Sequence, residues 1–255
     1  MFDTNRMYEA CVLVNGRSVT EVNHNGLTYI EGRSGSNYVL QFSNKSSERI
    51  MVVPSVDGLN VIDGNLCGTE SPGYLIERYS SIVIPGWKVD GTTAAKFQFR
   101  PRDGSTYTEM MGQSQENQGV IGFMVFTEKA KSYATPVYNT KSPLTPYFDY
   151  THYNYSNNYN EITSKSTVVR DVLVGSEIGT GFGEATKFNT HTVDFIKNSP
   201  FPISTLVMYY DTIQGLKKRG VPCHKFFKTY SEEPNPFPGS PSIYPGCKTP
   251  PGWTK

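Results

Sequence analysis

The stretch that decides the fold class runs from Met7 to Ser43 and reads MYEACVLVNGRSVTEVNHNGLTYIEGRSGSNYVLQFS. Apolar and polar side chains alternate within its runs, and turn-forming residues separate one run from the next. A period of two is typical of strands that bury one face. Asn15-Gly16 readily supplies the positive φ angles of a tight hairpin, so VLVNGRSV is predicted to fold back on itself. The four predicted strands are MYEACVLV, RSVTEV, LTYIE and SNYVLQFS.

The same pattern continues as far as Lys129. Two Asp-Gly dipeptides, Asp57-Gly58 and Asp63-Gly64, stand where a β run must turn. About eight short strands at a spacing of about ten residues predict a mainly β domain, a β-sandwich or jelly-roll-like core, over residues 1–129. The later runs are RIMVVPSV, YLIERYSSIVIPGW, AAKFQFR and VIGFMVFTEK.

Two segments have a different composition. Residues 130–165 are rich in Tyr, Asn, Ser and Pro, and no period survives in them. We expect either a long exposed loop or an arm that becomes ordered against something else, because this segment cannot bury enough apolar surface alone. Residues 231–255 carry a proline every few residues. Proline cannot donate to a regular hydrogen-bond ladder, so these residues are predicted to form an extended C-terminal arm.

Between these segments, residues 166–230 predict additional strands and one short helix that pack on the sandwich. The helix is expected from Thr212 to Arg219, since Asp211 can cap its first N–H groups and Gly220 follows its end. The strand runs are TVVRDVLVG, ATKFNTHTVDF and ISTLVMYYD.

Charge and composition narrow the classes of partner. The formal net charge is +1, and neither a basic block nor an acidic tail is present. Nothing therefore indicates a nucleic-acid partner or electrostatic binding to a membrane. The first residues lack the basic region and apolar run of a secretory signal, and no stretch approaches the ~20 apolar residues of a membrane span.

Cysteine usage points to a reducing compartment. Cys11, Cys67, Cys223 and Cys247 lie far apart, and no CxxC pair occurs. This spacing argues against a disulfide framework and against a structural zinc site. We expect reduced thiols in a protein made in a cytosol.

The glycine-rich run from Gly175 to Gly183 invites comparison with phosphate-binding loops. Its spacing is not GxGxxG, and no Gly-Lys-Ser/Thr follows it. The glycines are better explained by a loop that turns sharply or approaches another backbone closely.

Other candidate chemistry is also weak. Asp57, Asp63, Glu70 and Glu77 offer carboxylates for glycoside hydrolysis, but the two aspartates already have an explanation as turn residues. No two histidines stand at ligand spacing, and no GxSxG elbow occurs. The side chains of Cys223 and His224 should point in opposite directions in an extended chain. The sequence therefore predicts no catalytic residue, no cofactor and no metal site.

Aromatic side chains in the two arms are the best candidates for partner binding. One interpretation is that they anchor the arms on neighbouring proteins, and another is that the tyrosine and asparagine surface of the first arm recognises a glycan. A third interpretation is that these aromatic side chains only pack a loop against its own chain. The candidate anchors are Tyr147, Tyr150, Tyr153 and Tyr155 in the first arm, and Phe237, Tyr244 and Trp253 in the tail.

Three segments resemble an uncharacterised family of β-rich proteins from bacteria and tailed bacteriophages. They are SVDGLNVIDG (Ser55 to Gly64), GYLIERYSSIVIPGW (Gly73 to Trp87) and GTGFG (Gly179 to Gly183). These motifs consist of turn and strand residues with one tryptophan, so the resemblance implies no catalytic residue.

Together with the arms, the resemblance implies a non-enzymatic structural protein of a phage particle, such as a capsid decoration protein or a minor head or tail-associated subunit. Its partners would be other virion proteins, which can include copies of itself, and it would reach the virion after synthesis in the host cytoplasm. The alternative is a lectin-like carbohydrate-binding module that recognises a surface glycan.

Overall fold

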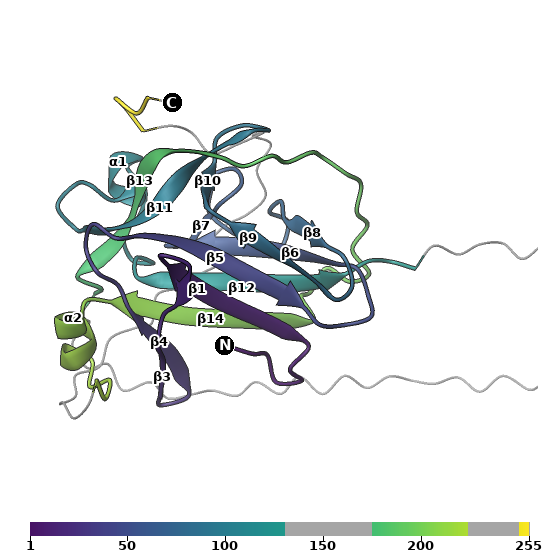
Figure 1. Cartoon of the computed structure of the whole chain (residues 1–255), viewed down its shortest axis with the longest axis horizontal. Helices are drawn as coiled ribbons and strands as arrows, with labels where there is room; N and C mark the ends of the chain where they lie inside the picture. The colour runs from purple at the N-terminus through teal and green to yellow at the C-terminus, as the bar shows by residue number, and fades with distance from the viewer. Residues whose placement is uncertain (131–174, 224–249, 255) are drawn as a thin grey trace, which may run out of the picture. The chain divides into compact units, whose positions relative to one another are not determined.

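The computed structural model describes residues 1–130, 175–223 and 250–254. Two sheets of seven strands each pack face to face, and the described residues contain two short helices (Figure 1). The prediction of a mainly β, sandwich-like core is confirmed. The predicted strand TVVRDVLVG lies outside the described residues except for Gly175. Most of both arms also lies outside them.

The first sheet has the strand order β10-β11-β5-β1-β2, with β13 paired to β11 and β9 paired to β5. Every pair in it is antiparallel. Its strands are β1 (Tyr8–Val14), β2 (Arg17–Ser18), β5 (Asn37–Asn44), β9 (Ser80–Ile84), β10 (Gly86–Lys88), β11 (Thr93–Pro101) and β13 (Ile178–Lys187).

The second sheet has the order β3-β4-β14-β12-β6-β7, with β8 paired to β6. The β14–β4 pair is parallel and the other pairs are antiparallel. Its strands are β3 (Glu21–His24), β4 (Leu27–Glu31), β6 (Ile50–Val56), β7 (Leu59–Asn60), β8 (Tyr74–Ile76), β12 (Val120–Thr127) and β14 (Ser204–Asp211). β14 lies between β4 and β12, and β13 pairs with β11, so the described strands that follow the first arm are part of the two sheets.

The predicted hairpin at Asn15-Gly16 is confirmed. Val14 pairs with Arg17, and the two turn residues have φ angles of 52° and 74°. The predicted strand RSVTEV, however, is wrong as one unit. It breaks at Val19-Thr20, because β2 belongs to the first sheet and β3 to the second. The chain therefore crosses between the two layers within these residues.

The glycine-rich run also differs from its expected loop, since Gly179 to Gly183 lie within β13. The structure shows the close approach that was the other explanation for these glycines. A Cβ at Gly181 would lie only 2.6 Å from Cγ of Arg100. The predicted strand ATKFNTHTVDF is correct only as far as Lys187. Residues 188–203 then run without a ladder, apart from one isolated bridge between Glu128 and Lys197.

Both helices are short. The predicted helix is confirmed as α2 (Ile213–Lys218), but its N-cap is Thr212 and not Asp211, which ends β14. Sequence reasoning missed α1 (Tyr107–Met110), which begins with a capping box between Thr106 and Glu109. This Ser/Thr-x-x-Glu pattern is a signal that could have found α1.

The main core lies between the sheets and is rich in aromatic side chains. Tyr38 stacks on Phe99 with ring centroids 4.3 Å apart, and Trp87 packs on Tyr107 of α1 at 4.5 Å. A second apolar cluster includes Met51, Val53, Cys67, Met124 and Phe126, with Phe195 of the 188–203 segment packed against it. That segment is therefore tied to the second sheet by packing.

Candidate functional site

Asp57 occupies one of the two-residue turns that the sequence predicts. Asp57 and Gly58 join β6 to β7 with φ angles of 52° and 78°, as a tight β-hairpin requires. The turn prediction is thus confirmed. The side chain has a further role, because Asp57 is only 1% exposed and a buried carboxylate needs hydrogen-bond donors.

Three donors from distant parts of the chain meet this carboxylate. Its Oδ1 accepts from the Gly119 N–H at 2.8 Å and from the Tyr210 hydroxyl at 2.6 Å. Its Oδ2 accepts from the Thr180 N–H at 2.7 Å. Thr180 belongs to the first sheet and Tyr210 to the second, so one carboxylate ties the two sheets together.

A chain of hydroxyl groups extends from the carboxylate. The Thr180 Oγ1 lies 2.7 Å from the Tyr210 hydroxyl and 2.7 Å from that of Tyr38. Because Tyr210 donates to the carboxylate, Thr180 donates to Tyr210 and accepts from Tyr38. Such chains polarise their members and strengthen each bond. We call Asp57, Tyr210, Thr180 and Tyr38 the buried network.

Electrostatics and burial give this network a structural role. Burial raises the pKa of Asp57 to about 6, although its hydrogen bonds act in the opposite direction. Burial and the neighbouring carboxylate also raise the pKa of both Tyr38 and Tyr210. All four side chains are at most 1% exposed. A substrate cannot reach them, so the perturbed carboxylate specifies the fold and not a reaction.

The segments quoted for the family resemblance meet at this place. Asp57 of the first segment binds Thr180 of the third, and the Trp87 indole of the second donates to the Gly181 carbonyl at 3.1 Å. A Cβ at Gly179 would come within 2.9 Å of the Thr106 side chain. These motifs therefore describe how two sheets join.

A second buried acid lies at the start of α2. Asp211 Oδ1 accepts from the N–H groups of Thr212 at 2.7 Å and Glu177 at 3.0 Å. The Arg219 Nε lies 3.5 Å from its Oδ2. Burial raises the pKa of Asp211 to about 6 despite this cation. This cluster fixes α2 against the end of β14.

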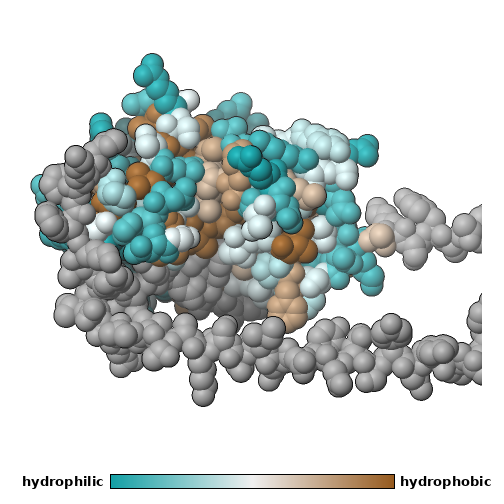
Figure 2. Space-filling model, turned by 90° about the horizontal axis from the view of Figure 1, so that it is seen from below, coloured by the Kyte–Doolittle hydropathy of each residue, from teal (hydrophilic) through white to brown (hydrophobic). Residues whose placement is uncertain are grey.

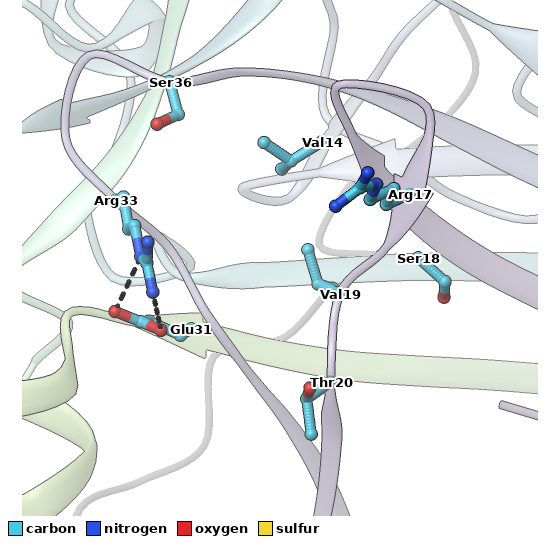
Figure 3. Close-up of a pocket in the computed structure, with 8 residues that line it drawn as sticks. All are labelled: Val14, Arg17, Ser18, Val19, Thr20, Glu31, Arg33 and Ser36. Carbon is cyan, nitrogen blue, oxygen red and sulfur yellow. Dashed lines mark hydrogen bonds and ion pairs between the residues drawn. The ribbon is translucent and has the colours of Figure 1, made fainter.

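A polar cavity of about 400 Å³ lies where the chain crosses between the sheets (Figure 3). Arg17 of β2 and Arg33 of the loop after β4 both line it, and Arg33 donates to both carboxylate oxygens of Glu31. The remaining lining residues are Val14, Ser18, Val19, Thr20 and Ser36. Because Arg33 is 77% exposed at its side chain, this ion pair is screened by solvent and preorganises the cavity only weakly.

A second cavity, of about 340 Å³, lies at β13 beside Trp253. The Trp253 indole packs edge-to-face on Phe182, with centroids 5.1 Å apart, and donates to the Gly183 carbonyl. Trp253 is half-buried against its own chain, while the rest of its ring lines the cavity. The polar lining comes from Asn37, Gln98, Arg100, Glu184 and Thr254.

A group of exposed apolar side chains lies on the segment between β13 and β14. Ile196 is 67% exposed and Phe201 is 74% exposed. The backbone beneath them is fixed to β12, since Lys129 donates to the Ile196 carbonyl at 2.8 Å and Ile203 donates to that of Val125 at 2.8 Å. Apolar side chains also reach the surface in several places on the face seen in Figure 2. We call Val193, Ile196, Phe201 and Ile203 the apolar strip.

The other predicted site residues are spread over the chain. Tyr147, Tyr150, Tyr153, Tyr155, Phe237 and Tyr244 lie outside the described residues. Glu70 pairs with Lys197 at 3.7 Å and Glu77 with Arg49 at 3.9 Å. Among residues 1–130, 175–223 and 250–254, no three His, Cys, Asp or Glu side chains gather as metal ligands would. Cys11, Cys67 and Cys223 are free thiols.

Comparison of the chain with known protein families, with curated proteins and with solved structures returns no match. No helix in the described part of the chain is long and apolar enough to cross a membrane. Function must therefore be inferred from surfaces and cavities.

Proposed function

We propose that this chain is a non-enzymatic structural protein of a bacteriophage particle, a capsid decoration protein or a minor head or tail-associated subunit. It acts by binding a neighbouring virion subunit through the apolar strip. The observation that carries this proposal is the exposure of Ile196 and Phe201 on a backbone that is already fixed. Exposed apolar side chains that gather on one segment are typical of protein interaction sites.

The segment that bears the strip is held by more than its backbone. Phe195 packs on the outer apolar cluster of the second sheet, and Lys197 lies 4.6 Å above the Phe126 ring. Lys197 also donates to the Thr69 carbonyl. Ile196 therefore points outward between two anchored neighbours. A preorganised surface of this kind loses little conformational entropy on binding, so more of its contact energy appears as affinity.

Two features of the sequence support the same proposal. The near-zero net charge lowers repulsion between copies in a crowded assembly. The segments Ser55 to Gly64, Gly73 to Trp87 and Gly179 to Gly183 resemble phage and bacterial proteins, and in this chain they build the core. Trp253 packs on Phe182 of its own chain, but the other aromatic anchors predicted in the two arms would add contacts to neighbouring subunits without enlarging that core.

The test measures incorporation of variants into particles. Particles are purified from a host that expresses Phe201→Ser or Ile196→Ser in place of the natural chain, and copies per particle are counted by quantitative mass spectrometry. Tyr79→Ser is the matched control, because Tyr79 is an aromatic residue that is 71% exposed on another segment. We expect the two strip variants to fold normally and to lose most of their incorporation.

The control should be incorporated at full occupancy. Full occupancy of the strip variants would refute the apolar strip as the contact. Absence of the natural chain from purified particles would refute the virion role itself.

A further inference from the structure

The cavity beside Trp253 combines an aromatic ring with polar groups that have no partner among the residues that the structure describes. The Arg100 guanidinium and the Asn37 amide form no hydrogen bond or ion pair with any residue that the structure describes. Both project from the first sheet into the same cavity of about 340 Å³. Gln98 uses its Nε2 to donate to the Gly35 carbonyl at 2.9 Å, which leaves its Oε1 to accept from a ligand.

The Trp253 ring is fixed in place. The edge-to-face contact with Phe182 and the indole hydrogen bond to the Gly183 carbonyl define its orientation, and Trp253 lines the cavity. The C-terminal segment that carries Trp253 lies beside β13 (Figure 1). An aromatic ring held in this way offers a rigid apolar platform at low entropic cost.

We infer that this cavity binds a pyranose sugar that carries a carboxylate. A pyranose has an apolar face of C–H groups, which suits the Trp253 ring, and a rim of hydroxyls, which suits the Asn37 and Gln98 amides. The Arg100 guanidinium is a planar fork that matches a carboxylate in bidentate geometry.

The charge balance of the cavity favours an acidic ligand over a basic one. Lys96 lies 3.1 Å from the Glu184 carboxylate, so among the described residues Arg100, Lys96 and Glu184 together carry one net positive charge at the cavity. Most of the side chains that line the cavity are polar, which suits a hydroxylated ligand better than an apolar one. The saccharide site lies on β5, β11 and β13, and the apolar strip lies on the 188–203 segment, so either can fail without the other.

The test is a titration of the full ¹⁵N-labelled chain with saccharides. Binding is measured by NMR from the two tryptophan indole N–H signals. The ligands are trigalacturonate, a glucuronate-containing chondroitin disaccharide and sialyllactose. We expect a saturable shift of the Trp253 signal with at least one of them. The buried Trp87 signal should stay in place.

Two controls separate a built site from simple anion binding. Arg100→Gln should weaken the binding about tenfold, in line with the loss of one charge-assisted pair, and the methyl ester of the same saccharide should weaken it by a similar factor. Arg17→Gln removes an arginine of the other cavity that also has no partner among the described residues, and it should leave the affinity unchanged.

Equal losses in Arg100→Gln and Arg17→Gln would overturn the inference, as would an equal shift with sodium sulfate. Silence of the Trp253 signal with all three saccharides would do the same. None of these results bears on incorporation into particles.

Discussion

Replacing Tyr210 by phenylalanine removes one hydroxyl from the buried network and leaves the ring in place. Tyr210 is 1% exposed, and its ring packs on Phe99 with centroids 5.2 Å apart, a contact that phenylalanine keeps. The lost hydroxyl donated to Asp57 at 2.6 Å and accepted from Thr180 at 2.7 Å. The substitution therefore deletes the link between the second sheet and the carboxylate without opening a large cavity.

The expected cost follows from the partners of that hydroxyl. A hydrogen bond to a buried charged group contributes about 1.5–3 kcal/mol, and one hydroxyl proton, on Thr180 or Tyr38, then lacks an acceptor, which costs about 1 kcal/mol more. We expect a loss of about 2.5–4 kcal/mol in the free energy of unfolding at pH 7.5. Tyr38→Phe removes only the neutral end of the chain and should cost about 1 kcal/mol.

The cost should also depend on pH. The pKa of Asp57 is raised to about 6, so the carboxylate is ionised at pH 7.5 and mostly protonated at pH 5. The Tyr210 hydroxyl stabilises the ionised form, and its bond is worth less once the charge is gone. The penalty of Tyr210→Phe should therefore shrink by about half between pH 7.5 and pH 5.

Urea unfolding of the natural chain and of both variants, followed by circular dichroism at the two pH values, measures these differences. Equal costs for Tyr210→Phe and Tyr38→Phe at pH 7.5 would refute the polarity assigned to the hydroxyl chain. A cost that does not change with pH would refute ionisation of Asp57 in the native state.

Three further predictions concern other contacts. The pKa values of Asp57 and Asp211 are both raised to about 6, above their usual 3.8, so each carboxylate binds more protons in the folded state than in the unfolded state. The free energy of unfolding of the natural chain should therefore increase as the pH falls from 7 to about 5. Urea unfolding across that range measures this change. Gly215→Ala places a Cβ 2.2 Å from the Asp211 carboxyl and should cost about 1–3 kcal/mol in the same assay, whereas an unchanged midpoint would mean that α2 shifts freely. Trp253→Ala uncovers Phe182 and should lower the melting temperature by several degrees, whereas an unchanged value by calorimetry would mean that the C-terminal contact contributes nothing.

The sequence predicts the sandwich because strand signals are local. Alternation with period two and the Asn15-Gly16 turn are properties of a few adjacent residues, and both appear in the structure as predicted. Assignment of a strand to a sheet is not local. The run RSVTEV alternates throughout, yet it changes sheets at Val19-Thr20, since periodicity reports a buried face and not which layer buries it.

Glycine misleads sequence reasoning for a similar reason. The run at Gly179 to Gly183 resembles a loop because glycine is rare in strands. In β13 the missing side chains make room for Thr106 and for the stem of Arg100, contacts that only the folded chain creates. The position of Asp57 in a turn was predictable, but its partners Thr180 and Tyr210 lie 123 and 153 residues away. No sequence pattern based on residue spacing predicts contacts between residues so far apart in the chain.

The buried network shows what the segments quoted for the family resemblance do in this chain. The Asp57 carboxylate of SVDG accepts from the Thr180 N–H of GTGFG, and the Gly181 carbonyl accepts from Trp87, so these polar atoms hold the fold together and are not available to a ligand. The groups that are free to bind, Ile196, Phe201 and Arg100, lie in plain segments that no motif marks. A chain that keeps the motifs and changes these three residues should therefore keep the fold and change its partner.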